Sequence, residues 1–374
     1  MTFADLLARY HRLEPKLASG GARYAVKRGL RGYPLHPGVA LLLAKADLRA
    51  EQLLDLSGSG GLVALGATAE KKRVLETSKA ALRCAAWTFA DALGSEISTE
   101  ISAGAPWDAP PAEADLVVLV PPTDRGSARV QAELAGAHAA LKPGGAAFIA
   151  MHKDQGAKRY EKLAAGLFGD LEVIAKDGGW RLVKARKSKL ETLEVEKKVF
   201  QAADLTLSAD PGVFAAGKLD LGTARLLQVV QLQDFAGKRV LDLGCGYGLI
   251  ALKASLAGAA VTAVDDDLLA VRSTHRNAGR YGADVRALHS DVDSELQDET
   301  FDAVLMNPPF HVGKQVVMEV PQAFLAAAYE RLRPGGTLTF VANRALPYER
   351  ELTGFSSWET VPSDGQFKVL RAVR

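Results

Sequence analysis

The chain has 374 residues, enough for two domains, and its hydrophobic content of 48% is ordinary for a folded globular protein. It has no apolar run of the roughly 18 residues that a membrane span needs. The start, MTFADLLARYHRLEP, has no apolar h-region, so we do not expect secretion. Its two cysteines suggest neither a disulfide framework nor a metal cluster, so we expect a cytoplasmic protein with no metal and no membrane partner.

The net charge of +2 is unevenly divided between the two halves of the chain. Residues 1–190 carry 27 Lys and Arg against 20 Asp and Glu, and the remainder carries 19 Lys and Arg against 24 Asp and Glu. A basic first half favours docking to a polyanion.

Three segments of the first half have the pattern of buried strands that lead into turns. LLDLSGSGG at 53–61 ends in a glycine-rich turn, DLVVLVPP at 115–122 ends in two prolines, and LKPGGAAFIA at 141–150 follows a Pro-Gly-Gly turn. The charged segment 186–204 lacks Gly and Pro and is predicted to be a linker or the first helix of a second domain.

The second half alternates between strand and helix patterns. Strands are predicted over 239–243, 260–264, 285–291, 301–307 and 336–343, and helices over 249–258, 268–282 and 321–333. The last stretch, 355–373, reads as a hairpin that turns at 363–365. This order predicts an α/β fold with a mostly parallel, doubly wound sheet that ends in an antiparallel hairpin.

The two halves repeat each other. The segments that begin at residues 53, 115 and 141 resemble those that begin at 240, 302 and 332, so the offsets are 187, 187 and 191 residues. Preserved order and spacing indicate a duplicated domain. We therefore predict two tandem Rossmann-like domains, 1–187 and 188–374.

The second half carries the pattern of a cofactor site. DLGCGYG follows a strand and opens a helix, and Gly244, Gly246 and Gly248 allow a ligand to approach the backbone. Asp242, before the first glycine, suits a ligand with an ammonium group. Asp265 and Asp291 follow the next two strands and are predicted to accept hydrogen bonds from ribose hydroxyls and from an adenine amine.

The segment Asn307-Pro308-Pro309-Phe310 at the exit of a buried strand predicts a site for a planar amine. The prolines remove backbone donors, so the Asn307 amide oxygen and the Pro308 carbonyl can accept both hydrogens of an NH₂ group. This holds the nitrogen toward a sulfonium methyl, so Asn307 also touches the cofactor. Phe310 offers a face for stacking a flat substrate. We predict that Asn307, Pro308 and Phe310 are catalytic, whereas His311 is expected to be structural.

These motifs resemble class I methyltransferases that use S-adenosylmethionine, and most closely the bacterial 16S ribosomal RNA guanine-N2 methyltransferases known as RsmC. The resemblance covers most of 210–374, including PGVFAAGKLDLGTARLL, NPPFH, VANRALPYE and GQFKVLRAV. It implies S-adenosylmethionine as cofactor and ribosomal RNA in the small subunit as partner. It further implies that Phe214, Asp220 and Thr223 lie near cofactor or base, and that Asn307 and Phe310 hold a flipped guanine. Phe367 and Lys368 in the closing hairpin are expected to edge the substrate pocket.

The first half keeps the turns of the repeat but not its chemistry. Val120 and Thr123 stand where the second half has Asn307 and Phe310, although Glu76 could mimic the ribose-binding acid. We predict that this half does not catalyse, does not bind cofactor tightly and serves as a structural partner and RNA platform. The candidate basic segments are 23–31, 71–73 and the group Lys153, Lys158, Arg159 and Lys162.

Two alternatives stay open from the residues alone. An Asn-Pro-Pro-aromatic motif also serves transfer to adenine N6 or to a glutamine amide, and a non-catalytic RNA-binding module could keep the same fold. The sequence does not indicate which nucleotide is modified, whether the substrate is free RNA or an assembled subunit, or the oligomeric state.

Overall fold

The computed structural model describes residues 2–18, 21–91, 98–309, 319–361 and 365–374. The chain divides into two compact units. The first unit spans 13–196, and the second unit comprises 1–12 together with 197–374. The division therefore falls nine residues beyond the predicted boundary at 187/188, and the N-terminal segment belongs to the second unit.

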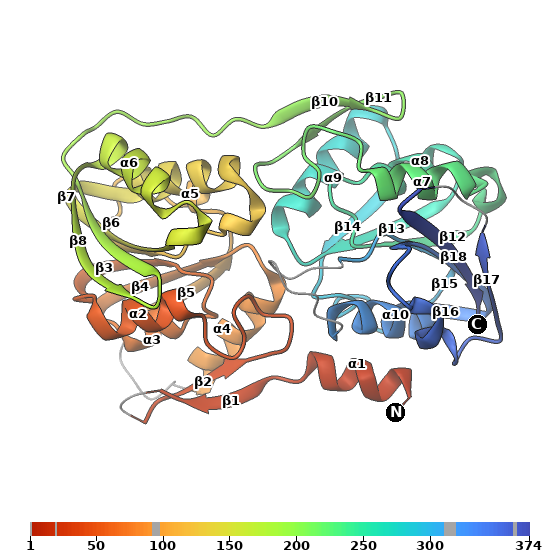
Figure 1. Ribbon diagram of the computed structural model, residues 1–374, viewed down its shortest axis with the longest axis horizontal. Helices are drawn as coiled ribbons and strands as arrows, with labels where there is room; N and C mark the ends of the chain where they lie inside the picture. Colours follow the sequence, from red (N-terminus) through yellow and green to blue (C-terminus); the bar gives the residue numbers. More distant parts are fainter. Residues whose placement is uncertain (1, 19–20, 92–97, 310–318, 362–364) are drawn as a thin grey trace. The chain divides into compact units, whose positions relative to one another are not determined.

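The first unit is built on a seven-stranded sheet with the strand order β5-β4-β3-β6-β7-β9-β8 (Figure 1). Its strands are β3 (Arg49–Leu56), β4 (Thr68–Glu76), β5 (Ser98–Ala103), β6 (Ala114–Leu119), β7 (Leu141–His152), β8 (Gly169–Asp177) and β9 (Trp180–Lys187). Its helices are α2 (Pro37–Lys45), α3 (Leu62–Gly66), α4 (Lys79–Asp91), α5 (Ser127–Ala140) and α6 (Ala157–Phe168). A separate antiparallel pair, β1 (Glu14–Leu17) and β2 (Arg23–Val26), precedes them.

The second unit has the same topology, with the strand order β14-β13-β12-β15-β16-β18-β17. Its strands are β12 (Arg239–Leu243), β13 (Ala260–Asp265), β14 (Val285–His289), β15 (Phe301–Met306), β16 (Leu332–Asn343), β17 (Ser357–Val361) and β18 (Phe367–Val373). Its helices are α1 (Phe3–His11), α7 (Leu221–Val229), α8 (Leu249–Leu256), α9 (Leu268–Tyr281) and α10 (Glu319–Arg331). The hairpin of β10 (Lys198–Ala202) and β11 (Leu205–Ala209) opens the main part of this unit.

In both sheets the first five strands pair in parallel and the last two pair antiparallel, which confirms the predicted fold class and the duplication. The repeat extends to partly buried polar contacts. The Asp115 carboxylate accepts from the backbone N–H of Gln52 at 3.0 Å, and Asp302, 187 residues later, accepts from that of Arg239 at 2.8 Å. These two carboxylates therefore join neighbouring strands and have a structural role.

Some element boundaries differ from the predicted ones. The segment 188–197 is irregular and then continues as β10, so it is a linker and not a helix. Strand β14 ends at His289, which places Asp291 in the following loop. Helix α10 spans Glu319–Arg331 and gives way to β16 at Leu332, so it ends two residues before the predicted end at 333. Pro334 accounts for part of this difference, because proline disfavours helix in the residue before it.

Helix α1 packs against α10 in the second unit (Figure 1). The Phe3 ring lies 4.7 Å from that of Tyr329 and 5.6 Å from that of Phe355, and Leu7 and Tyr10 are buried in the same core. A segment from the start of the chain thus completes the core of the C-terminal sheet. Sequence periodicity could not show this, because it reports only which face of a helix is apolar.

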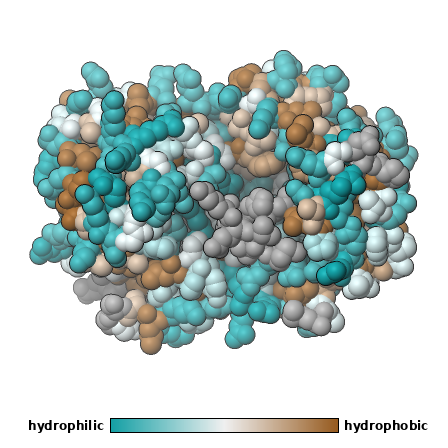
Figure 2. Space-filling view, in the orientation of Figure 1, coloured by the Kyte–Doolittle hydropathy of each residue, from teal (hydrophilic) through white to brown (hydrophobic). Residues whose placement is uncertain are grey.

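Hydrophilic residues make up most of the face shown in Figure 2, with small apolar patches between them. No helix within the described residues is both long enough and apolar enough to cross a membrane.

Candidate functional site

A pocket of the second unit opens over the glycine-rich turn after β12. It is lined by the turn residues 244–247, by the start of α8, by the segment before α7 with the first turn of that helix, and by the loop after β15: Phe214, Asp220, Thr223, Gly244, Cys245, Gly246, Tyr247, Leu249, Ile250 and Asn307. The pocket thus brings together the predicted cofactor turn and the predicted amine-binding loop. Both lie at the carboxyl ends of parallel strands, where α/β sheets bind their ligands.

The Asn307 side chain is fixed by two hydrogen bonds from its amide nitrogen. Nδ2 donates to Oδ2 of Asp220 at 2.9 Å and to Oγ1 of Thr223 at 3.0 Å. A carboxylate can only accept, so this contact decides which end of the amide faces Asp220. The amide oxygen Oδ1 is therefore the end that is left to accept from a ligand.

The start of α7 provides both partners of Asn307. Asp220 is the N-cap of α7 and accepts from the backbone N–H of Thr223 at 2.9 Å. Gly222 allows the close approach, because a Cβ at this position would lie 3.0 Å from the Asp220 carboxylate and 3.5 Å from the Asn307 amide. Helix capping and amide orientation thus depend on the same carboxylate oxygen.

The glycine-rich turn has the backbone that the sequence predicted for a ligand cradle. Gly244, Gly246 and Gly248 have φ of 83°, 58° and 84°, a region that favours glycine. A Cβ on Gly246 would meet nothing within 4 Å, so this face of the turn is open. Asp265 at the end of β13 accepts from the N–H of Gly246 at 2.9 Å and thereby holds the turn against the neighbouring strand.

Asp242 is fully buried beneath this turn. Its Oδ2 accepts from the N–H of Ala251 at 2.9 Å, whereas its Oδ1 has no hydrogen-bond partner. Burial and the nearby charge of Asp265 raise the pKa of Asp242 to about 7. In the first unit, Asp55 also accepts from a helix N–H, that of Ala64, at 2.9 Å. The bond to α8 is therefore structural, and the unpaired oxygen of Asp242 is the part that suits a cationic ligand.

Asp291 follows β14 and is 1% exposed. His11 of α1 lies beside it, with Nδ1 3.7 Å from Asp291 Oδ2 and Nε2 2.7 Å from Asp293 Oδ1. Burial opposes protonation of His11, but hydrogen bonds to the two carboxylates and their charges outweigh it and raise its pKa. The loop with the predicted adenine-binding acid is thus braced by a helix from the start of the chain.

Other predicted site residues take different positions. The Phe214 side chain is 58% exposed at the pocket. Phe367 is partly buried in the core, and the buried Lys368 pairs with Glu349 at 2.6 Å, so the side chain of Lys368 is engaged in an ion pair. Phe310 and His311 lie outside the described residues.

The sequence reasoning missed two contributors to the site. Tyr247, within the turn, lines the pocket, and its hydroxyl donates to the carbonyl of Lys218 at 3.2 Å. Asn277 of α9 donates to the carbonyl of Tyr247 at 2.8 Å and accepts from the N–H of Ser208 at 2.9 Å, which ties the turn to β11. An asparagine in the middle of a helix pattern was the signal that could have revealed this contact.

The predicted basic segments of the first unit differ in their exposure. Lys27 and Lys72 are buried, and Arg73 forms ion pairs with Glu100 and Glu113 at 3.0 Å. Four basic side chains on and just before α6 are exposed, and we refer to them as the α6 basic face: Lys153, Lys158, Arg159 and Lys162.

Comparisons with known proteins agree with this architecture. The methyltransferase small domain family matches residues 34–184 and 204–371. A protein of Aeromonas hydrophila, "Ribosomal RNA small subunit methyltransferase C", is 36% identical over 266 residues, which cover 68% of this chain and 75% of that protein. A protein of the same name from Chromohalobacter salexigens is 42% identical over 178 residues, 47% of this chain and 53% of that protein. The matches to several of these curated relatives thus span about half of their length.

One solved structure matches the whole chain. It is described as "T. Thermophilus 16S rRNA N2 G1207 methyltransferase (RsmC) in complex with AdoMet and Guanosine". It superposes with a TM-score of 0.89 at 36% sequence identity and covers 100% of both chains.

Proposed function

Since this chain belongs to the ribosomal RNA small subunit methyltransferase C family, with the methyltransferase small domain present twice, we propose that it methylates the exocyclic N2 of a guanine in 16S ribosomal RNA. The methyl donor is S-adenosylmethionine, bound by the second unit. The first unit does not catalyse. It supports the fold and offers a basic surface to the RNA.

The orientation of Asn307 is the observation that carries this proposal. Asp220 and Thr223 occupy the amide nitrogen, which leaves the amide oxygen as an acceptor at the mouth of the pocket. The carbonyl of Pro308 adjoins it, and neither Pro308 nor Pro309 contributes a backbone donor. Two adjacent acceptors without a competing donor match the two hydrogens of a planar NH₂ group.

The acceptor pair performs two tasks in the transfer. It orients the amine so that its nitrogen faces the methyl group, and it stabilises the positive charge that develops on the nitrogen as the N–C bond forms and the C–S bond breaks. One amine proton is then released. The exposed Phe214 offers an aromatic face to a base that has left its helix.

The residues around the turn fit S-adenosylmethionine. The cofactor supplies an electrophilic methyl group on a sulfonium centre. Asp265 is suited to the ribose hydroxyls, Asp291 to the adenine amine and Asp242 to the ammonium group, while the open face of Gly246 leaves room for the ligand. Thr223 and Asn307 adjoin the same pocket. The buried and unpaired oxygen of Asp242 supports this assignment, because such a group is costly unless a ligand compensates it.

We assign recognition of the RNA to electrostatic attraction between basic side chains and phosphates. The α6 basic face carries four exposed cations and can contact phosphates of the small-subunit RNA without regard to sequence. We further propose that the protein acts in the cytoplasm, where ribosomal subunits are available.

Asn307→Ala tests the proposal. We expect this variant to lose methyl transfer to 16S RNA while its affinity for S-adenosylmethionine, measured by calorimetry, changes little. Thr123→Ala, at the matching loop of the first unit, is the control and should keep full activity. A fully active Asn307→Ala variant would show that the amine is held elsewhere.

A further inference from the structure

The loop that follows β6 in the first unit corresponds to the proposed amine-binding loop that follows β15 in the second. Val120 and Pro121 lie 187 residues before Asn307 and Pro308, each pair at the exit of the equivalent strand, β6 or β15. The carbonyl of Pro121 matches the proposed acceptor carbonyl of Pro308, and the carbonyl of Val120 adjoins it in the chain, whereas the acceptor side chain of Asn307 has no counterpart in Val120. The loop thus keeps part of an acceptor site for an amine.

A side chain of the first unit occupies these acceptors. Arg31 donates from Nη1 to the carbonyl of Val120 and from Nη2 to that of Pro121, both at 2.9 Å. Its Nε lies 3.6 Å from Oδ1 of Asp124, which follows in the same loop. Two carbonyls and one carboxylate of a single loop therefore hold the guanidinium group.

Arg31 also has an equivalent position in the second unit. It lies two residues after Gly29 and one before Gly32, which have φ of 84° and 75°. Phe214 stands in the same relation to Gly212 and Ala215, which have φ of 84° and 55°. Where the second unit exposes an aromatic ring at its pocket, the first unit therefore places an arginine that turns back onto the loop.

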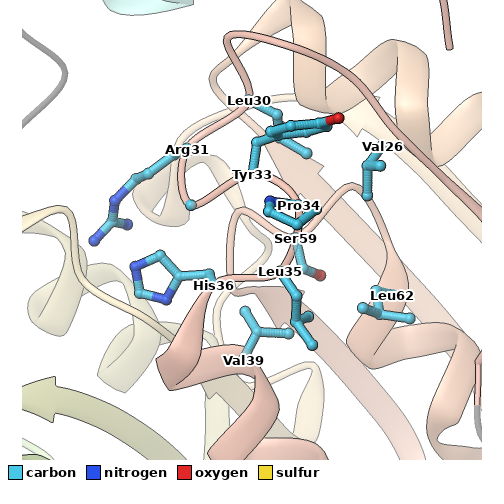
Figure 3. A pocket seen from close by; sticks show the side chains of 11 residues that line it. Val26, Leu30, Arg31, Tyr33, Pro34, Leu35, His36, Val39, Ser59 and Leu62 are labelled. Atoms are coloured by element: carbon cyan, nitrogen blue, oxygen red, sulfur yellow. The ribbon is translucent and has the colours of Figure 1, made fainter. Parts of the chain in front are cut away.

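The residues around Arg31 allow it to stay bound to the two carbonyls. Figure 3 shows Arg31 and His36 on one side of a small pocket, with Val26 and Leu62 on the other. Burial and the charge of Arg31 lower the pKa of His36 to about 4, so its ring is neutral at pH 7. His36 therefore does not compete as a cation for the two carbonyls.

The cofactor turn of the first unit also differs from that of the second. Ser59 stands where the second unit has the open Gly246, and its hydroxyl is hydrogen-bonded to Ser57 at 2.8 Å. Glu76 is 4% exposed and accepts from the N–H of Gly60 at 3.1 Å. A Cβ on Gly60 would lie 2.7 Å from the Cβ of Cys84, so the turn packs against α4 at this position.

We propose that the first unit retains a binding site for a planar amine or guanidinium group, and that Arg31 fills this site as a built-in ligand. The forked guanidinium takes the place that the NH₂ of a target base takes in an active unit. Arg31 thereby keeps a target base out of the first unit, so each chain binds one target base, in the second unit.

Removal of the occupant tests the proposal. In the full-length protein, the Trp358→Phe background leaves three tryptophans, Trp87, Trp107 and Trp180, all within 13–196, so their fluorescence reports unfolding of the first unit. In this background we expect Arg31→Ala to lower the unfolding temperature by roughly 10 °C, because two charge-assisted hydrogen bonds are lost.

Guanidinium ion then serves as the probe. At about 20 mM, well below denaturing concentrations, guanidinium should reverse at least half of the decrease in unfolding temperature caused by Arg31→Ala. Sodium at equal ionic strength should not. The matched control is Arg186→Ala, which removes an exposed arginine bonded to one carbonyl, that of Gly144 at 3.0 Å. It should show little destabilisation and no recovery.

The outcomes separate a filled site from an ordinary surface arginine. An Arg31→Ala protein that unfolds at the parent temperature, or that responds equally to guanidinium and sodium, would overturn the proposal. If Arg31→Ala does not fold, Arg31→Lys decides: the ammonium cannot contact both carbonyls as a fork, so lower stability is expected and unchanged stability would contradict the site. The readout is stability of the first unit and does not depend on methyl transfer.

Discussion

Neutralising Asp220 tests how the amide of Asn307 is oriented. Asp220→Asn keeps the shape of the side chain, and its amide oxygen can still cap α7 by accepting from the N–H of Thr223. It replaces the charge-assisted bond to Asn307 Nδ2, 2.9 Å long, with a neutral one. Charge-assisted bonds are roughly twice as strong as neutral ones, so about 1.4 kcal/mol of orienting free energy is lost. We therefore expect kcat to fall about tenfold.

Thr223→Val removes the other partner of the amide without changing the size of the side chain. A neutral hydrogen bond contributes about 1 kcal/mol, so kcat should fall about fivefold. The double variant should fall about fiftyfold, unless it first reaches the level of Asn307→Ala. Circular dichroism and calorimetric titration with S-adenosylmethionine control for folding and cofactor binding. An Asp220→Asn enzyme with the parent kcat would refute the idea that this carboxylate orients the acceptor.

Three further predictions concern titration and charge. Because the pKa of Asp242 is raised from 3.8 to about 7, the free energy of unfolding should decrease between pH 4 and pH 8, by on the order of 4 kcal/mol, and denaturant titrations of Asp242→Asn should lack this slope. Because the pKa of His11 is raised in the folded protein, protonated His11 stabilises the fold below pH 6.5, and this stabilisation is lost as pH rises through the folded pKa. Because the pKa of Asp293 is lowered, ionised Asp293 stabilises the fold above pH 3.8, and this stabilisation is lost as pH falls through its folded pKa. His11→Gln should therefore flatten the decline in the free energy of unfolding above pH 6.5. Glutamine at all four positions of the α6 basic face should lower the slope of log affinity for 16S RNA against log salt by up to about three, while changes at the exposed Lys45 and Lys176 should leave the slope unchanged.

The sequence predicted the repeated fold because its evidence is local and occurs twice. Apolar runs, the glycine turn after β12 and the double proline after β15 each fix a short segment, and order in the chain then fixes which strands are neighbours. The same reasoning identified Asn307 and the acids that follow the strands, because their chemistry depends on residue type and on position at one sheet edge.

The remaining features depend on contacts between distant segments. That α1 joins the C-terminal sheet, and that His11 braces the loop of Asp291, follows from packing and leaves no periodic signal in the sequence. The segment after 188 resembled a helix by composition, but its end pairs as β10 with β11, and tertiary pairing overrides a weak local preference. Composition alone makes Arg31 one cation of a basic segment, although its guanidinium group binds two carbonyls inside the first unit.

The central claim is that the second unit methylates a guanine amine of small-subunit ribosomal RNA. Purified protein should be incubated with isotope-labelled S-adenosylmethionine and either 16S RNA or small ribosomal subunits, followed by nucleoside analysis and mapping of the labelled position. We predict label in N2-methylguanosine at one position with the parent protein and none with Asn307→Ala. Label in N6-methyladenosine or in protein, or no transfer to either substrate, would contradict the claim.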